Sequence, residues 1–461
     1  MRPRVKPALR RILRDERTLQ FGVHPRRAVL VSELAPSVRQ WIDRLDGTRE
    51  IAQVMREASG AGLSEEGARS LLDTLTARGV LDDAAVRPAT LARLSLAERD
   101  RLRPELDALD LASTIPGGGL ETMRRRREAR VRVYGAGRVG AQVVALLAAS
   151  GVGQVRVVDP APARAEDLVP GGLGWAELGA PREEGAVAVA RRITAGGSGL
   201  SASGDRSGGC SEVSGDPAPR PSGRASGRGA GAASDRASGR ASERASDRAS
   251  ERASDRASER ASGRASGRAS GRASGAASAR RREAWPAVDG GPSVEAVAGA
   301  PHLCDGSQRP DLVILAPVGP LDAILVSELV TMRIPHLLVT AFEGHGSVGP
   351  LVRPGETACL HCLDLARRDR DPAWPIVTAH LGGFPVGEIA CGSALATLVA
   401  AAATGHALAH IDGQESAVTN DTMDVMPDWH WKRRSWTMHP QCRCWRKEFS
   451  ALTMVRPGSC S

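Results

Sequence analysis

The stretch that decides the fold is "ARVRVYGAGRVGAQVVALLAASGVGQVRVVD", residues 129–159. "VRVY" predicts a strand, "AQVVALLAAS" a helix and "QVRVVD" a second strand, with the turn "GAGRVG" between the first two. We expect Gly135 to permit the tight turn, Gly137 to let a phosphate approach the backbone, and Gly140 to let the helix lie close to the sheet. Asp159, which closes the second strand, is then placed to accept a hydrogen bond from a ribose hydroxyl.

Strand, glycine turn, helix, strand and acid in register predict a Rossmann-like unit, in which amides at the helix N-terminus face an anion. The sheet is expected to continue at residues 309–318, where "RPDLVILAPV" is typical of a buried parallel strand. A helix through "DAILVSELVTMRI" and a strand, "HLLVTAF", follow it. The fold class is therefore α/β, with a mostly parallel sheet that carries helices on both faces.

A polar, low-complexity tract separates the two halves of this predicted sheet. From Asp235 to Gly275 it repeats a tetrad of Arg, Ala, Ser and one of Asp, Glu or Gly, with no apolar residue larger than alanine. Such a composition cannot offset the entropy of ordering a chain. We predict a disordered insertion within one domain, and we take Cys210 inside it as incidental.

The N-terminal region shows a different pattern. Residues 19–31, "LQFGVHPRRAVLV", predict a short hairpin, and "PSVRQWIDRLDG", "TREIAQVMREA" and "EEGARSLLDTLTARG" predict three helices. We expect Thr48 and Ser64 to cap the second and third helices, and Gly47 and Gly79 to end the first and third. With "VLDD" returning as a strand, these elements make a small winged-helix-like module. By pattern alone it can be a structural appendage or a DNA-reading helix-turn-helix.

Four cysteines stand in two closely spaced pairs, Cys359 with Cys362 in "CLHC" and Cys442 with Cys444 in "CRC". A CxxC turn directs two sulfurs to one point, and a CxC pair can supply the other edge of a tetrahedron around zinc. Four sulfur ligands leave no position for water, so the site is predicted to be structural. Unligated thiols, a redox pair, or a mixed site that uses His361 or His439 are the alternatives.

Two other features leave alternatives open. Cys391 in "GEIACGSALATLV" is either a buried packing residue or a nucleophile, and the apolar helix around it favours packing. The arginines of "DLARRDRDPAWP" either dock an acidic partner or pair with the neighbouring aspartates.

Composition narrows the function classes. The formal charge is +9, yet of 62 basic residues only Lys6, Lys432 and Lys447 are lysine, and the arginines are dispersed along the chain. Nucleic acid is therefore an unlikely partner. The basic N-terminus lacks an apolar signal core, which predicts a cytoplasmic protein. Residues 392–411, the most apolar stretch, predict a buried helix rather than a membrane span.

These motifs carry a family resemblance. The GxGxxG unit, "GPLVRPGETACLHCLDLARRDRDPAWP" and the distal "HPQCRCW" resemble the ThiF/MoeB/HesA superfamily, relatives of ubiquitin-activating enzymes. The similarity is greater to an actinobacterial branch of leader peptide-binding proteins. That branch is associated with cyclodehydratases that form azoles in ribosomally made, post-translationally modified peptides (RiPPs), bacteriocins among them. "GVHPRRAVLV", "LDGTREIAQVM" and "LLDTLTARGVLDD" resemble PqqD-like recognition elements, which capture a leader peptide at a sheet edge.

The resemblance implies a homodimer, structural zinc, and ATP with magnesium at the glycine turn. Here the adenylating pattern is degraded. Only Arg164 stands near the expected Asn and Arg pair, Arg182 replaces a lysine, and Val318 and Gly319 occupy the place of the magnesium-binding Asp. Asp322 follows a few residues later and is equally well explained as a helix cap. No catalytic residue is assigned.

Three functions remain open at this point. The first is a binding protein that captures a precursor (leader) peptide and presents it to a separate cyclodehydratase. The second is an active ATP-dependent adenylyltransferase that acts on a peptide carboxylate. A nucleotide-dependent oxidoreductase is the third, and it leaves the cysteines and the N-terminal module unexplained.

The expected organisation has five parts: a winged-helix-like recognition element at 1–90, the first half of the α/β nucleotide-binding domain at 125–195, the insertion at 196–285, the second half with the CxxC pair at 286–415, and a tail with the CxC pair at 416–461.

Overall fold

The computed structural model describes residues 1–86, 89–92, 94–194, 292–297, 303, 309–319, 321–380 and 390–444. The predicted disordered insertion at 196–285, with Cys210, lies outside the described residues.

An eight-stranded sheet forms the centre of the fold, in the order β13-β12-β11-β10-β9-β6-β7-β8. The five strands from β10 to β8 are mutually parallel, and β11, β12 and β13 are antiparallel to their neighbours. Strands before the insertion, β6 and β7, lie between β9 and β8, which follow it. Both halves of the chain therefore build one sheet, as predicted. The strands are β6 (Arg130–Tyr134), β7 (Gln154–Val158), β8 (Ser293–Ala296), β9 (Leu312–Leu315), β10 (His336–Phe342), β11 (His345–Val352), β12 (Asp421–Val425) and β13 (Trp431–Ser435).

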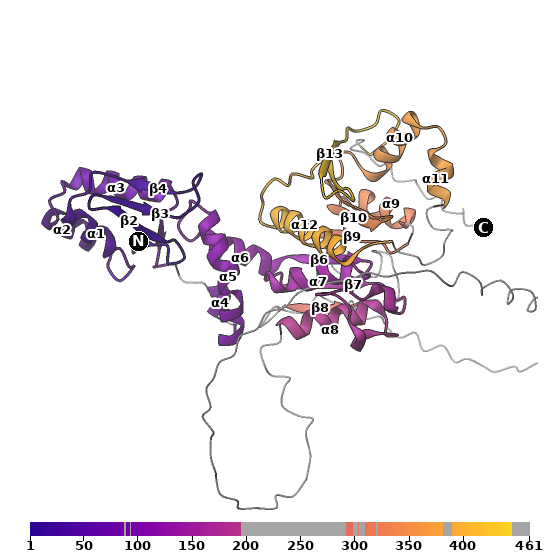
Figure 1. Cartoon of the computed structure of the whole chain (residues 1–461), viewed down its shortest axis with the longest axis horizontal. Helices are drawn as coiled ribbons and strands as arrows, with labels where there is room; N and C mark the ends of the chain where they lie inside the picture. The colour runs from indigo at the N-terminus through magenta and orange to yellow at the C-terminus, as the bar shows by residue number, and fades with distance from the viewer. Residues whose placement is uncertain are drawn as a thin grey trace, which may run out of the picture. The chain divides into compact units, whose positions relative to one another are not determined.

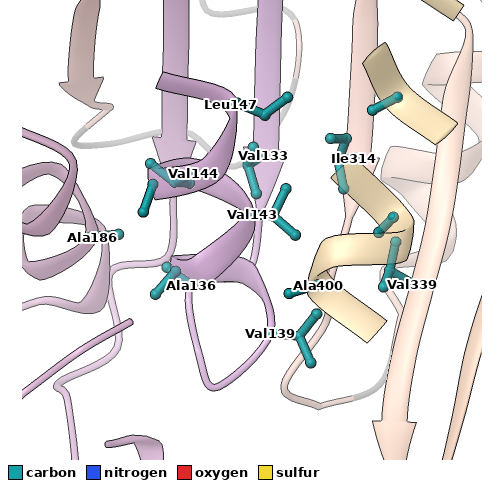
Figure 2. Packing of buried hydrophobic residues seen from close by; sticks show 14 of the residues in the cluster. Val133, Ala136, Val139, Val143, Val144, Leu147, Ala186, Ile314, Val339 and Ala400 are labelled. Carbon is teal, nitrogen blue, oxygen red and sulfur yellow. The ribbon is translucent and has the colours of Figure 1, made fainter. Parts of the chain in front are cut away.

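Helices cover both faces of this sheet. Alternate residues of β9 point to opposite sides, so Leu312 and Ile314 join one hydrophobic core and Val313 and Leu315 the other. Figure 2 shows the first core, where α7 lies over β6 and Ala400 of α12 lies beside Val139. The predicted α/β class with helices on both faces is confirmed. The first face carries α7 (Gly140–Ala149), α8 (Arg182–Thr194) and α12 (Ser393–Ile411), and the second carries α9 (Ala323–Thr331) and α10 (Leu360–Arg370).

Helix α12 is, within the described part of the chain, the one helix long and apolar enough to cross a membrane by length and composition. Its residues Leu395, Val399 and Ala403 are buried in the core against α7, β10 and β11. Figure 1 shows it alongside β9 and β10. Only 39% of its apolar window is buried, so the prediction of a buried helix holds for one face of α12.

The antiparallel strands β11, β12 and β13 were not expected from the sequence. The glycines of "GHGSVGPLV" look like those of a loop, but each has a packing reason in a strand. A Cβ at Gly346 would lie 2.3 Å from Cγ2 of Val399, and one at Gly349 would lie 2.4 Å from the carbonyl oxygen of Asp421. Glycine lets α12 and β12 approach β11 closely. Residues 416–461, expected as a tail, thus supply two strands to the sheet.

The N-terminal region contains the predicted hairpin, β3 (Thr18–Phe21) with β4 (Val29–Val31), and the three predicted helices. Two expectations are corrected. A third strand, β2 (Arg11–Asp15), pairs with β3, and the returning strand β5 (Leu81–Asp83) pairs with β1 (Pro3–Val5) in a separate sheet. The two strands that were not expected are β1, which has three residues, and β2, which is rich in charge. Neither contains an apolar run. The helices are α1 (Pro36–Asp43), α2 (Ile51–Gly60) and α3 (Glu65–Ala77).

The predicted caps are partly correct. Ser64 accepts a 3.0 Å hydrogen bond from the amide of Gly67, and α3 ends two residues before Gly79, which has φ +72°. Thr48 does not cap α2, because its hydroxyl donates to Asp46 and α2 begins at Ile51. Helix α1 ends at Asp43, four residues before Gly47.

Further helices, α4 (Ala89–Ala92), α5 (Leu96–Ala112) and α6 (Gly118–Glu128), connect the N-terminal elements to β6, and α11 (Trp374–His380) follows α10.

Candidate functional sites

The glycine turn joins β6 to α7 at the carboxyl end of the sheet. Gly135 has φ +90°, and a Cβ there would lie 2.0 Å from the carbonyl oxygen of Ala316. A Cβ at Gly140 would lie 1.9 Å from the carbonyl oxygen of Gly135. Neither position admits another residue without moving backbone, so both glycines are accounted for by the close contact of β6, α7 and the end of β9.

Gly137 differs from its two neighbours. A Cβ there would lie 2.6 Å from Cγ2 of Val318 and 3.5 Å from Oδ1 of Asp167. Both contacts are side chains rather than backbone. The space beside the turn, where a phosphate is predicted to approach, is therefore bordered by an isopropyl group and a carboxylate oxygen.

Asp159 and Arg182 meet beneath the turn, with a third residue that sequence reasoning missed, Asp167. The Arg182 Nε donates to Oδ2 of Asp167 at 2.7 Å, and its Nη1 lies 3.7 Å from Oδ1 of Asp159. Asp159 Oδ2 also accepts from the amide of Ala136 at 2.8 Å. All three charged side chains are buried, so one guanidinium serves two carboxylates. Burial raises the pKa of Asp159, although the Ala136 amide and Arg182 both favour its ionised form.

Asp167 is fully buried, and its Oδ1 has no hydrogen-bond partner in the described part of the chain. It closes a short 3₁₀ turn, Ala165–Asp167, in which Oδ2 accepts from the amide of Arg164. The acidic stretch "AED", residues 165–167, was the signal in the sequence that could have pointed to Asp167. Its spacing from Asp159 and Arg182 does not reveal that the three side chains converge.

The other cations near the turn also have local partners. Arg138 donates to the carbonyl oxygens of Glu166 and Leu168 at 2.7 and 2.8 Å, and Arg164 pairs with Glu166 at 3.3 Å. After β9 the chain places Val318 and Gly319, and the Asp322 carboxylate caps α9 by accepting from the amide of Ile324 at 2.8 Å. The nucleotide roles of the glycine turn, Asp159 and Arg182 remain predictions.

The four cysteines lie together on the face of the sheet that carries α9 and α10. Cys359 is 3.7 Å from Cys362 and 3.6 Å from Cys442, and Cys362 is 3.4 Å from Cys444, all measured between sulfurs. All four sulfurs lie within 4.8 Å of one another, and all four residues are buried. Sulfurs bound to one zinc ion at 2.3 Å in tetrahedral geometry are about 3.8 Å apart. The cluster can hold a metal ion, and its sulfur spacing is compatible with the predicted tetrahedral zinc site.

The pKa values of the thiols show why a cation would stabilise this cluster. A hydrogen bond with Cys362, together with burial, raises the pKa of Cys359, whereas the same bond lowers the pKa of Cys362 to about 4. Burial raises the pKa of Cys444 to about 12. Neighbouring thiolates repel, so the four sulfurs can ionise together only around a cation.

The histidines named as substitute ligands are outside the cluster. His439 Nε2 lies 2.8 Å from Oδ2 of Asp369, and its Nδ1 accepts from the amide of Gln441. Its carbonyl oxygen accepts from the amide of Cys442 at 2.9 Å, so His439 shapes the loop that carries the second pair. His361 is exposed.

The remaining candidates have local explanations. Cys391 is buried in the core of the first face, and burial raises its pKa, which favours packing over nucleophilic attack. Arg367 lies over the rings of both Trp374 and Trp436, at 5.0 and 5.4 Å, and 3.6 Å from Asp364. The arginines of α10 are thus engaged within the chain rather than free for an acidic partner.

The N-terminal three-stranded sheet has two edges of different character. β2 carries a register irregularity between Leu13 and Asp15 and is rich in charge, features that protect an edge against further pairing. β4 is regular and contains Val29, Leu30 and Val31, and Leu30 is 50% exposed. Within the described residues no strand pairs with the outer edge of β4.

Comparison with solved structures places this fold among known ones. A crystal structure of E. coli MccB with MccA-N7isoASN matches with a TM-score of 0.57 at 11% identity, over 96% of this chain and 99% of that chain. E. coli MccB with AMPCPP and selenomethionine MccA matches with a TM-score of 0.58 at 12% identity, over the same shares. PaaA matches with a TM-score of 0.54 at 13% identity, over 94% of this chain and 100% of that chain.

No protein-family model and no curated protein matches the chain. At 11 to 13% identity the structural likeness concerns the fold. This chain therefore has a mixed α/β fold similar to the fold of MccB and PaaA, extending over nearly its whole length.

Proposed function

We propose that this chain captures a precursor (leader) peptide at its N-terminal module and presents it to a separate cyclodehydratase in RiPP biosynthesis. The ThiF-like resemblance and the PqqD-like stretches motivate the proposal, and the MccB structures with MccA supply a fold neighbour with a bound peptide. The expected homodimer and cytoplasmic location belong to the same proposal.

One observation carries it, namely the uncharged, regular outer edge of β4. A strand edge offers unpaired amides and carbonyls to an extended peptide, and apolar side chains beside it provide pockets. The other edge, β2, is charged and irregular. Both edge strands of this sheet carry apolar side chains, but of the two only β4 is uncharged and regular in register.

The state of the glycine turn supports binding over catalysis. Nucleotidyl transfer needs cations aimed at the phosphates and a carboxylate that holds magnesium. Here Arg182 is held by two buried carboxylates, Arg138 by two carbonyl oxygens, and Val318 stands after β9. The glycine turn keeps its backbone geometry, but the cations near it are bound to groups of the chain itself rather than left for a phosphate.

A matched pair of variants tests the peptide site. Peptides selected from a displayed random library on the full-length chain are measured against Leu30→Lys on β4 and Leu13→Lys on β2, whose side chains are 50% and 52% exposed. We expect Leu30→Lys to weaken binding about tenfold or more, and Leu13→Lys to leave it unchanged. Equal losses, or none, would contradict capture at β4.

The second candidate is the ATP-dependent adenylyltransferase acting on a peptide carboxylate. It is favoured by the intact turn geometry at Gly135 and Gly140, which leaves the first amides of α7 beside the turn. Exchange of pyrophosphate into ATP that requires both the selected peptide and magnesium would establish it and overturn the purely binding role. We expect no such exchange in the natural chain.

A further inference from the structure

Strand β13 is the terminal strand of the central sheet, and it lies far in sequence from the N-terminal module. All five of its residues are exposed, and within the described part of the chain no strand pairs with its outer edge. It runs antiparallel to β12 from Trp431 to Ser435.

The hydrogen bonds at both ends of this hairpin show which peptide groups face outward. The amide of Met426 donates to His430, and the amide of Trp436 donates to Asn420. Hydrogen-bonded pairs recur at every second residue of an antiparallel ladder. The peptide groups of Lys432 and Arg434 therefore face β12, and those of Trp431, Arg433 and Ser435 face the free edge.

Basic side chains lie on both faces of this edge. Lys432 and Arg434 share a face with Asp424, and these three, with Arg433, His345 and Met426, line a groove of about 650 Å³. Arg433 projects to the other face, where it pairs with Asp421. The paired carboxylates are nearly buried, while the side chains of Arg433 and Arg434 are 61% and 45% exposed, so the surface presented to a partner is basic.

The turn that leads into β13 carries an exposed aromatic residue in an unusual conformation. Trp429 has φ +63° and is 56% exposed, and Trp431 is 38% exposed. A bulky residue in the left-handed region is a strained choice, and such choices concentrate at functional surfaces. Two indole rings beside a strand edge give a partner apolar surface to contact.

We propose that β13 is a docking edge for an extended acidic peptide segment, which adds as a ninth strand and alternates its acidic side chains between the two faces. Lysine and arginine on an edge repel neutral or basic strands and accept an acidic one. A second copy of this strand would place like charges opposite one another. Nucleic acid fits less well, because the cations are divided between the two faces of the strand rather than gathered along one.

This surface is separate from the peptide site proposed at β4. It uses different residues, so its success or failure is measured independently of the function proposed above.

The test measures, by fluorescence anisotropy, the affinity of the full chain for a fluorescent synthetic peptide that repeats two glutamates followed by two valines, which places glutamate on both faces of an added strand. Trp431→Pro removes an outward amide that β12 does not use, whereas Trp431→Ala removes the same ring and keeps the amide. We expect the proline variant to bind about fivefold more weakly than the alanine variant. Equal affinities would overturn strand addition.

A second test changes the peptide instead of the protein, by methylating alternate backbone amides, so its result does not depend on how any variant folds. Methylation in the register that faces β13 should abolish binding, and methylation in the other register should not. If both methylated peptides bind alike, main-chain pairing is refuted.

Charge is tested with matched substitutions. Lys432→Glu should weaken peptide binding about tenfold at low salt, whereas Arg103→Glu, the same charge change at an exposed position of α5, should have little effect. A single-stranded oligonucleotide that binds the natural chain more tightly than the peptide does would overturn the proposal in favour of nucleic acid. Absence of saturable binding by the natural chain would overturn it outright.

Discussion

The glycine turn and the cysteine cluster, two conspicuous motifs in the sequence, differ in how the fold satisfies their charged groups. At the turn, Arg182 lies between Asp159 and Asp167, and every described cation nearby has a partner within the chain. At the cluster, four buried sulfurs have mainly one another as partners. At the turn the cations are held by carboxylates and carbonyl oxygens of the chain itself, whereas the described residues supply no cation among the four sulfurs.

The comparison shows why a motif alone does not establish a binding site. Glycine spacing reports backbone geometry, and that geometry is retained here at Gly135 and Gly140. Whether an anion is attracted depends on side chains from other segments, above all Asp167 and Val318. For the cysteines, the motif itself supplies the sulfurs that would bind a metal ion. Bringing the two pairs together is therefore sufficient to form the candidate site.

Removing one sulfur of the predicted zinc site should have the largest effect. Cys362→Ser should abolish zinc binding and remove metal-linked stability of about 10 kcal/mol, because the remaining thiols cannot ionise together without the ion. Elemental analysis and calorimetric unfolding of the same preparation measure both effects. Cys391→Ser, buried but outside the cluster, is the control and should retain zinc. Natural protein that contains no metal and unfolds like Cys362→Ser would break the comparison.

Removing the guanidinium at the turn should have the next largest effect. Arg182→Met leaves the carboxylates of Asp159 and Asp167 buried without a cation, which should lower the free energy of unfolding by about 3 to 5 kcal/mol. Adding Asp167→Asn should recover part of the loss, as chemical denaturation can show. Arg164→Met, whose side chain is half exposed, should cost about 0.5 kcal/mol or less.

The stability of Arg182→Met should also depend on pH, and the sign of this dependence follows from the pKa of Asp159. The pKa of Asp159 is raised in the folded state above its ordinary value of 3.8. The folded chain therefore binds this proton more tightly than the unfolded chain does, and stability rises as pH falls through the raised pKa. Loss of Arg182 should strengthen the effect, so Arg182→Met should recover stability relative to the natural chain as the pH is lowered from neutral toward the ordinary carboxyl pKa of 3.8. A deficit that is constant across this range would contradict the buried-carboxylate explanation.

The smallest effect distinguishes two glycines of one motif. Gly140→Ala meets the backbone carbonyl of Gly135 and should cost about 3 kcal/mol, whereas Gly137→Ala meets the side chain of Val318 and should cost about 1 kcal/mol. Val318→Ala should relieve the second loss and leave the first unchanged. Urea denaturation of the natural chain, Val318→Ala, the two glycine variants and the two double variants measures both effects. Equal losses for the two glycine variants would show that Gly137 is also held by backbone packing.

The strands and helices with continuous apolar runs were predictable, among them β6, β7, β9, β10, α7 and α12. Strands β11 and β13 were missed for different reasons. β11 contains glycines that its neighbours require, and β13, "WKRRS", is an exposed edge with no apolar alternation. Apolar alternation marks a half-buried strand, so it misses a buried strand interrupted by glycines and a strand whose side chains are all exposed.

By itself the sequence determined the α/β unit at 129–159, the continuity of the sheet across the insertion, and the four cysteines of the cluster, because periodicity and cysteine spacing are local properties. Only the tertiary structure decided that Arg182 is held by Asp159 and Asp167, that Val318 stands beside Gly137, and that β4 and β13 are free edges among the described strands. Those facts depend on contacts between segments far apart in the chain, where folding sets the distance between charges and the pairing of strands.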